Sequence, residues 1–200
     1  MNDVPLACSC KKMRGVAAVS PSSGTRVVCY CKDCQAFAAF LEKADLVLDA
    51  HGGSDIFQTA PSRIRFTSGA AELACVRLSA EGMFRWYAGC CKTPIGNTLG
   101  AKMPFVGTIS AIMDHAADGR SRDAVLGPVV GRIHGREAIG GSAPGAHPRA
   151  ALSLVPRVVR NLAVWKLSGA GWPSPFFERD TKAPRATPRI LTPAERAALA

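Results

Sequence analysis

The sequence predicts a mostly β fold, in which a zinc-binding antiparallel β domain precedes a C-terminal appendage of helical and extended chain. Three observations predict it. Short apolar stretches alternate with turn residues over the first 110 residues, seven of eight cysteines fall into three close groups, and the longest helical period appears after residue 150. With 200 residues, 48% of them hydrophobic, the chain is long enough to bury a core.

Six short stretches in the first part of the chain have the composition and length of strands. They are Arg26–Val28, Leu46–Leu48, Arg63–Phe66, Leu73–Leu78, Met83–Tyr87 and Phe105–Ile109. Turn-forming pairs such as Gly52-Gly53 and Ser68-Gly69 separate them. This regular spacing is typical of an antiparallel β domain, which we expect to span residues 1–115.

Helices are expected at three places. The segment Cys34–Leu41 carries apolar residues at helical spacing and begins at a cysteine. Residues 150–167 show a second helical face, and Thr192–Glu195 has the cap and the proline of a helix start. Residues 116–200 are therefore expected to form a basic, Gly- and Pro-rich extension with one or two helices packed on the domain. We expect its apolar stretch Trp172–Phe177 to lie extended in a groove of the domain.

The net charge of +10 is concentrated in the second part of the chain. Residues 1–119 hold 12 Lys and Arg against 10 Asp and Glu, whereas residues 120–200 hold 13 against 5. A basic segment suits a nucleic acid, a membrane surface or an anionic small molecule, but scattered arginines are also typical of a solvated surface. The charge pattern therefore favours nucleic acid as a partner less than it favours a small molecule.

The sequence also bears on membranes and on the cell compartment. No apolar run reaches the roughly 18–20 residues of a membrane span, so we expect no membrane partner. The first residues show neither the basic start nor the apolar stretch of a secretion signal, which predicts a cytoplasmic protein. The sequence does not predict an oligomeric state.

Seven of the eight cysteines form three groups: Cys8-Ser9-Cys10, Cys29-Tyr30-Cys31-Lys32-Asp33-Cys34 and Cys90-Cys91. A reducing cytosol disfavours stable disulfides, and cysteines two or three apart bond poorly to each other. Thiolates at this spacing converge well on a soft, tetrahedral ion such as zinc. We therefore expect two zinc sites. The remaining cysteine, Cys75, lies in an alternating stretch and is expected in the core.

The middle group offers three ligands within six residues. In a strand, Cys29 and Cys31 face the same side, and a turn through Lys32 and Asp33 can bring Cys34 back to them. A zinc with three protein ligands is typical of catalytic sites, because the fourth position takes water or substrate. A fourth ligand from Cys75, a histidine or a partner would instead make the site structural. The residues alone leave both readings open.

The outer groups are expected to form the second site. Cys8 and Cys10 supply half of it from one side of a strand, and Cys90 and Cys91 are the obvious source of the other half. Both late cysteines can take part only if Gly89 allows a sharp turn. Such a site closes a long loop, so its role would be structural and its metal would add to folding stability.

The order of these groups resembles that of the glutathione-dependent formaldehyde-activating enzyme (GFA) and centromere protein V family. That family carries an early C-x-C, then C-x-C-x-x-C, then a late C-x-x-C followed by Gly-Thr. The matching stretches cover roughly residues 5–110. Two positions depart from the family pattern: Ala88 stands where the first late cysteine belongs, and Gln35 replaces the basic residue that commonly follows the middle group.

The resemblance implies a GFA-like β fold and assigns roles to the cysteines. Cys8, Cys10 and Cys91 would be structural zinc ligands, with Cys90 in place of the cysteine missing at Ala88. The catalytic zinc ligands would be Cys29, Cys31 and Cys34.

The chemistry that the resemblance implies is that of a carbon–sulfur lyase acting on an adduct of a glutathione-like thiol with an aldehyde. Lys32 or Arg85 would help to bind the carboxylates of glutathione. A non-catalytic zinc scaffold and a nucleic-acid-binding zinc module are the alternatives. His134 and Glu137 look like half a metal site, but with no helix predicted around them we interpret their spacing as coincidental.

Overall fold

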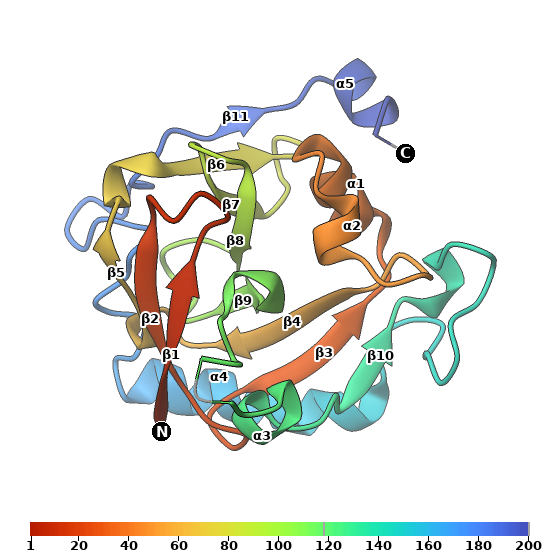
Figure 1. Ribbon diagram of the computed structural model, residues 1–200, viewed down its shortest axis with the longest axis horizontal. Coiled ribbons are helices and arrows are strands. Elements are labelled where there is room, and N and C mark those ends of the chain that lie inside the picture. The colour runs from red at the N-terminus through yellow and green to blue at the C-terminus, as the bar shows by residue number, and fades with distance from the viewer. Residues whose placement is uncertain (118, 200) are drawn as a thin grey trace.

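The computed structural model describes residues 1–117 and 119–199 and is mostly β, as predicted. Its strands form an eight-stranded sheet and a three-stranded sheet (Figure 1). The eight-stranded sheet has the order β10-β3-β4-β9-β8-β7-β6-β11, and the three-stranded sheet has the order β1-β2-β5.

The large sheet contains both predicted and unpredicted strands. Its members are β3 (Thr25–Cys29), β4 (Ser54–Thr59), β6 (Leu73–Arg77), β7 (Phe84–Ala88), β8 (Thr93–Thr98), β9 (Val106–Ile109), β10 (Gly131–Ile133) and β11 (Arg189–Ile190). Neighbouring strands are antiparallel from β3 to β6, which confirms the expected antiparallel core. The two outermost strands pair in parallel with β3 and β6, and both come from the chain beyond residue 115.

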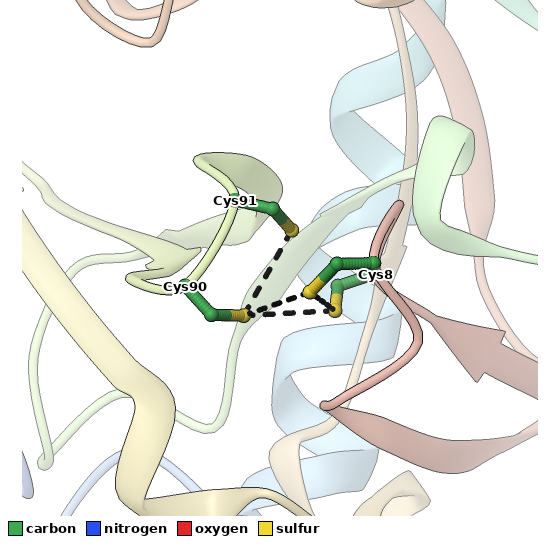
Figure 2. A group of neighbouring side chains, drawn as sticks. Cys8, Cys90 and Cys91 are labelled. Carbon is green, nitrogen blue, oxygen red and sulfur yellow. Dashed lines mark hydrogen bonds between the residues drawn. The ribbon is translucent and has the colours of Figure 1, made fainter.

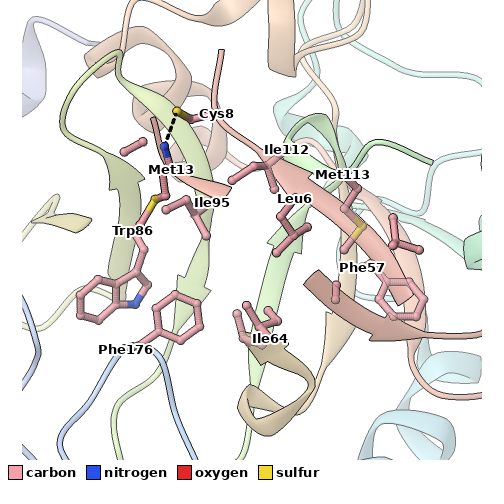
Figure 3. Close-up of a cluster of buried hydrophobic side chains, with 14 of the residues drawn as sticks. Leu6, Cys8, Met13, Phe57, Ile64, Trp86, Ile95, Ile112, Met113 and Phe176 are labelled. Atoms are coloured by element: carbon pink, nitrogen blue, oxygen red, sulfur yellow. Dashed lines mark hydrogen bonds between the residues drawn. The ribbon is translucent and has the colours of Figure 1, made fainter. Parts of the chain in front are cut away.

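The small sheet consists of β1 (Asn2–Ala7), β2 (Arg14–Val19) and β5 (Ile64–Ser68). Its residues alternate between buried and accessible positions, as expected for a sheet with one face on a core. Val4, Leu6 and Ile64 face inward and pack in the same cluster as Trp86 of the large sheet (Figure 3). The core therefore lies between the two sheets.

Five α-helices accompany the sheets in the described residues: α1 (Lys32–Phe40), α2 (Ala44–Val47), α3 (Arg122–Leu126), α4 (Val155–Leu167) and α5 (Pro193–Ala197). The helices expected over Cys34–Leu41, within residues 150–167 and at Thr192 are all present, although α1 begins two residues before Cys34. In α4, Pro156 occupies the first turn, where its missing N–H costs no hydrogen bond. In α5, Thr192 and Glu195 form the reciprocal capping box that their spacing predicts.

The prediction of a strand over Leu46–Leu48 is wrong. These residues belong mostly to α2, and Leu48 makes only an isolated bridge to Ser54. Leu46 is exposed, whereas Val47 packs beside α1, because consecutive residues of a helical turn point in different directions.

The extended stretch near the C-terminus is part of the core. Phe176 and Phe177 are almost fully buried, and their rings lie 5.2 and 5.4 Å from the ring of Trp86. Figure 3 shows Phe176 beside Trp86 within this cluster. The expectation that this stretch packs on the domain is thus confirmed at Phe176 and Phe177, which complete the core between the sheets.

An ion-pair network ties the extension to β3 and β4. Arg26, almost fully buried on β3, donates to both carboxylate oxygens of Asp55 on β4, at 2.8–3.2 Å, and lies 2.5 Å from Asp123 of α3. Arg122 donates a further bond to Asp55 at 3.0 Å. Burial by itself would raise the pKa of Asp55, but the bonds and charges of Arg26 and Arg122 hold it below its usual value.

Within the described chain no helix is both long enough and apolar enough to cross a membrane.

Replacing Phe176 by Ala is expected to destabilise the whole protein by about 3–5 kcal/mol, because it leaves a cavity beside Trp86. The matched control is Leu167→Ala at the end of α4, where the side chain is 88% exposed. That change should cost less than about 0.5 kcal/mol. Chemical denaturation measures both. Equal effects would show that the C-terminal stretch does not contribute to the core.

Replacing Asp55 by Asn is expected to cost about 2 kcal/mol at neutral pH, because Arg26 then loses a charged acceptor. The folded pKa of Asp55 is lowered, so its contribution is complete above the unfolded value of about 3.9 and is lost as pH falls through the folded value. The difference between the two proteins should therefore shrink only below about pH 4. Unfolding curves from pH 3 to 7 measure it, with Asp45→Asn, at an exposed residue of α2, as the control.

Candidate metal centres

The early and late cysteines meet at the tips of two hairpins. Cys8 and Cys10 lie in the loop between β1 and β2, and Cys90 and Cys91 lie in the loop between β7 and β8. Their four sulfur atoms lie within 4.8 Å of one another. Figure 2 shows the sulfur atoms of the two loops directed toward one another across the space between them.

The spacing of these sulfur atoms matches that of a tetrahedral zinc site. Four sulfurs, each about 2.3 Å from a zinc ion, lie about 3.8 Å apart. In the structure, Cys8 Sγ is 3.5 Å from Cys10 Sγ and 3.8 Å from Cys90 Sγ, and Cys10 Sγ is 3.4 Å from Cys90 Sγ. Cys91 Sγ is 3.8 Å from Cys90 Sγ. This cluster, the four-cysteine site, could therefore hold a zinc ion with no change of fold.

The two loops are shaped to bring these cysteines together. Cys8 and Cys10 were expected on a strand, but they follow β1 in a tight turn that Lys11 closes with φ of 62°. In the late loop, Lys92 takes a φ of 57°, so the sharp turn expected at Gly89 depends on Lys92 instead. Because Cys90 and Cys91 lie in a turn rather than a strand, both of their side chains can reach the same point.

Hydrogen bonds hold the loops in this arrangement. The backbone N–H of Ser9 donates to the hydroxyl of Thr93 at 2.9 Å, which joins the two loops directly. The N–H of Met13 donates to Cys8 Sγ at 3.3 Å. Burial raises the pKa of Cys90 and of Cys8. Burial would also raise the pKa of Cys91, but hydrogen bonds from Thr93, whose hydroxyl lies 3.1 Å from Cys91 Sγ, and from Cys10 together outweigh it and lower that pKa to about 6.

The middle cysteines form a second cluster, the three-cysteine site. Cys29 is the last residue of β3, Cys31 caps the N-terminus of α1, and Cys34 lies in the first turn of that helix. Their sulfur atoms are within 4.8 Å of one another. Cys29 and Cys34 are buried and Cys31 is half-buried, so the cluster reaches the surface through Cys31.

The helix start concentrates negative charge on this cluster. The helix dipole favours thiolates at the N-terminus of α1. Hydrogen bonds from Cys29 and Cys34 lower the pKa of Cys31 to about 2. The same bond to Cys31 raises the pKa of Cys29 to about 12, and the neighbouring thiols raise that of Cys34. Without a metal, these contacts favour the thiolate at Cys31 and the thiol at Cys29 and Cys34.

Residues distant in sequence hold α1 in place. Asp33 pairs with Arg85 of β7 at 3.1 Å and with Arg196 of α5. Gln35 donates to the carbonyls of Tyr30 and Glu137, at 2.7 and 2.8 Å. These contacts connect the three-cysteine site to both the large sheet and the extension.

Glu137 is a site neighbour that the sequence did not indicate. Its carboxylate accepts a hydrogen bond from the N–H of Lys32, the first residue of α1, at 2.7 Å and lies 3.4 Å from Nδ1 of His134. His134 and Glu137, whose spacing we interpreted as coincidental, thus lie in a loop that contacts the start of α1. Its only sequence signal was that weak pairing, because the contact joins residues 105 positions apart.

The three-cysteine site has no fourth ligand from the described residues: no other Cys, His, Asp or Glu joins the cluster. Cys75, one of the sources considered, is buried in β6, where burial raises its pKa to about 12. It is a core residue, as expected. The two sites thus differ in kind, one with four sulfur ligands and one with three.

Fold and sites together define a mostly β protein with two cysteine clusters that could each hold a metal ion. The chain belongs to a family of unknown function, DUF6151, whose sequence profile matches residues 1–186. No curated protein matches the chain significantly. The matched range includes both cysteine clusters and the C-terminal phenylalanines.

Replacing Cys8 by Ser is expected to reduce the zinc content of the purified protein by one ion per chain. It should also destabilise the fold by several kcal/mol, because metal binding free energy at a site that links distant loops contributes to folding. Elemental analysis and thermal unfolding measure these effects. The control, Cys75→Ala, removes a thiol that neither cluster uses and should leave the zinc content unchanged. An unchanged zinc content in Cys8→Ser would contradict the four-cysteine site.

Proposed function

We propose that this protein is a two-zinc protein of the GFA-like type, with a structural zinc at the four-cysteine site and a reactive zinc held by Cys29, Cys31 and Cys34. Its proposed activity is that of a carbon–sulfur lyase acting on an adduct of a glutathione-like thiol with an aldehyde. One observation carries the proposal. The middle cluster offers three thiol ligands, and the part of the chain that the structure describes supplies no fourth.

The number of ligands is what separates a reactive zinc site from a structural one. Structural zinc sites are closed by four protein ligands, whereas catalytic sites keep one position for water or substrate. The four-cysteine site fits the first class and the three-cysteine site fits the second. The half-buried Cys31 supports access to the open position from the surface.

The reaction breaks the bond between sulfur and the carbon that carries a hydroxyl group. The hydroxyl oxygen loses its proton and becomes the carbonyl oxygen of the aldehyde, while sulfur leaves with the electron pair and takes up a proton. The reverse reaction joins thiol and aldehyde, and neither direction needs an oxidant or a reductant. When bound, zinc would supply a Lewis acid that stabilises a thiolate or polarises a carbonyl.

The residues around the site contribute binding and positioning. The positive end of α1 favours negative charge on sulfur at the three-cysteine site. The Lys32 side chain is exposed, and its ammonium group has no partner among the described residues, so it is available for a carboxylate of glutathione.

Arg85 is not available in that way, which corrects the sequence-based expectation. Its side chain is almost fully buried and donates to Asp33 at 3.1 Å and to Asn97 at 3.3 Å. It acts as a positioning residue for α1. The basic residue that commonly follows the middle group in the GFA family is also absent here. Gln35 stands in its place and donates to the carbonyl of Glu137.

The structure gives less support to nucleic-acid binding. Within the part of the chain that the structure describes, acids pair with Arg122, Arg132, Arg185, Arg189 and Arg196, all beyond position 119. Paired arginines have less charge to offer to phosphates. The scaffold alternative remains the main competitor, and it predicts a protein that binds two zinc ions but accelerates no reaction.

The two-zinc protein is expected to accelerate the exchange between glutathione plus formaldehyde and their hydroxymethyl adduct. NMR exchange spectroscopy measures this rate directly. The variant with Cys29, Cys31 and Cys34 all changed to Ser should lose the acceleration and one zinc while keeping its fold, because the four-cysteine site is intact.

A single substitution tests substrate binding. Lys32→Ala should raise KM about threefold, as expected for an exposed ion pair, with kcat little changed. Lys12→Ala, at an exposed lysine in the loop of the four-cysteine site, is the control and should change neither value. A wild-type protein with two zincs and no acceleration would reject the lyase and favour the scaffold.

A further inference from the structure

A pocket of about 480 Å³ opens on the small sheet, and no cysteine lines it. Its floor is the outer face of that sheet, and its wall is the stretch Pro173–Pro175 together with Arg185. This volume lies within the range of roughly 300–1,000 Å³ typical of small-molecule sites. The pocket is therefore large enough for a ligand, and it shares no lining residue with either cysteine cluster.

The floor follows from strand alternation. Ala17 of β2 is buried and pairs with the buried Ile64 of β5, so the neighbouring residues point the opposite way. Val16 lies directly across from Arg65, and both line the pocket. Ala18 continues the apolar surface along β2. One guanidinium group therefore stands at the edge of an apolar floor.

The wall is fixed before any ligand binds. Phe176 follows it directly, is fully buried, and has its ring 6.1 Å from that of Phe66 on β5. Its N–H donates to Ser174 Oγ at 3.2 Å, and Nε of Arg185 donates to the carbonyl of Ser174 at 3.4 Å. A preformed site of this kind loses little conformational entropy on binding.

The pocket carries an excess of positive charge. Three arginines line it, Arg63, Arg65 and Arg185, against one acid, Asp3. Arg185 is paired with Glu178 at 2.7 Å. Arg63 donates to the carbonyl of Ser23 and to the hydroxyl of Thr59, and no acid among the described residues pairs with it.

Arg65 differs from the other two arginines. It is exposed, and the structure gives its guanidinium group no partner within residues 1–117 and 119–199. An unpaired, planar guanidinium group beside an apolar surface suits a ligand that has one carboxylate and an apolar body.

We propose that this pocket binds a small organic acid, with its carboxylate on Arg65 and its aromatic or short aliphatic body against Val16, Ala18 and the Pro173–Pro175 wall. The single free guanidinium matches one negative charge, and the apolar floor matches the uncharged part of the ligand. This site is independent of the proposed lyase activity.

Calorimetric titration with 2-naphthoate tests the proposal. The acid should bind, and neutral 2-naphthalenemethanol should bind at least about tenfold more weakly, because it lacks the charge-assisted bonds. Arg65→Met should weaken naphthoate binding by about the same factor. Arg14→Met, at an exposed arginine of β2 outside the pocket, should leave it unchanged. Ala18→Phe should abolish binding of both compounds by filling the pocket while Arg65 stays in place.

Thermal unfolding and zinc content of each variant show whether its fold is intact. Equal affinity for the acid and the alcohol would overturn the proposal, as would equal effects of Arg65→Met and Arg14→Met. Displacement of naphthoate by inorganic phosphate at equal concentration would also overturn it, since it would define a site for small anions without an apolar requirement. Loss of naphthoate binding in Ala18→Phe with normal unfolding and zinc content supports it.

Discussion

The rest of the structure depends on the convergence of four sulfur atoms at the tips of two hairpins. Cys8 and Cys10 belong to the hairpin that starts the small sheet, and Cys90 and Cys91 belong to a hairpin of the large sheet. A metal ion held there would join the two sheets at one end of the core and close a loop of about 80 residues. The hydrogen bond between Ser9 and Thr93 joins the same two loops without a metal ion.

The three-cysteine site depends on a different constraint. Its ligands come from one local segment, where a strand ends and a helix begins, so their approach needs little of the rest of the fold. The orientation of that helix, in contrast, depends on Asp33, which bonds Arg85 and Arg196, and on Gln35, which bonds the loop of Glu137. Two of these three partners lie beyond residue 115, so the extension supports the site as well as the core.

The sequence predicted those features that depend on short-range patterns. The β character, the helix after Cys31, the capping box at Thr192 and the grouping of the cysteines all follow from residues a few positions apart. Strands β2, β4, β8 and β11 were missed. In β4 and β8 the residues mix polar and apolar types although most are buried. The pattern of a half-exposed strand does not apply to a strand in the middle of the large sheet.

Long-range contacts could not be predicted from one sequence. The pairing of Cys8 and Cys10 with both Cys90 and Cys91 was a choice among possible ligands, and the structure brings all four together. The burial of Arg85 and the approach of Glu137 to the start of α1 depend on residues more than 50 positions apart. Such contacts have no signature in local spacing, since they arise only when the sheets close around the core.

X-ray absorption spectroscopy of the purified, zinc-loaded protein tests the central claim, that one chain holds two zinc sites of different kinds. The account predicts zinc–sulfur distances of about 2.3 Å and an average shell of three to four sulfur ligands with a minor oxygen or nitrogen contribution. In the variant with Cys29, Cys31 and Cys34 changed to Ser, that contribution should disappear and four sulfurs remain. A shell of four sulfurs in the unchanged protein would contradict the open site, and a shell without sulfur would contradict both.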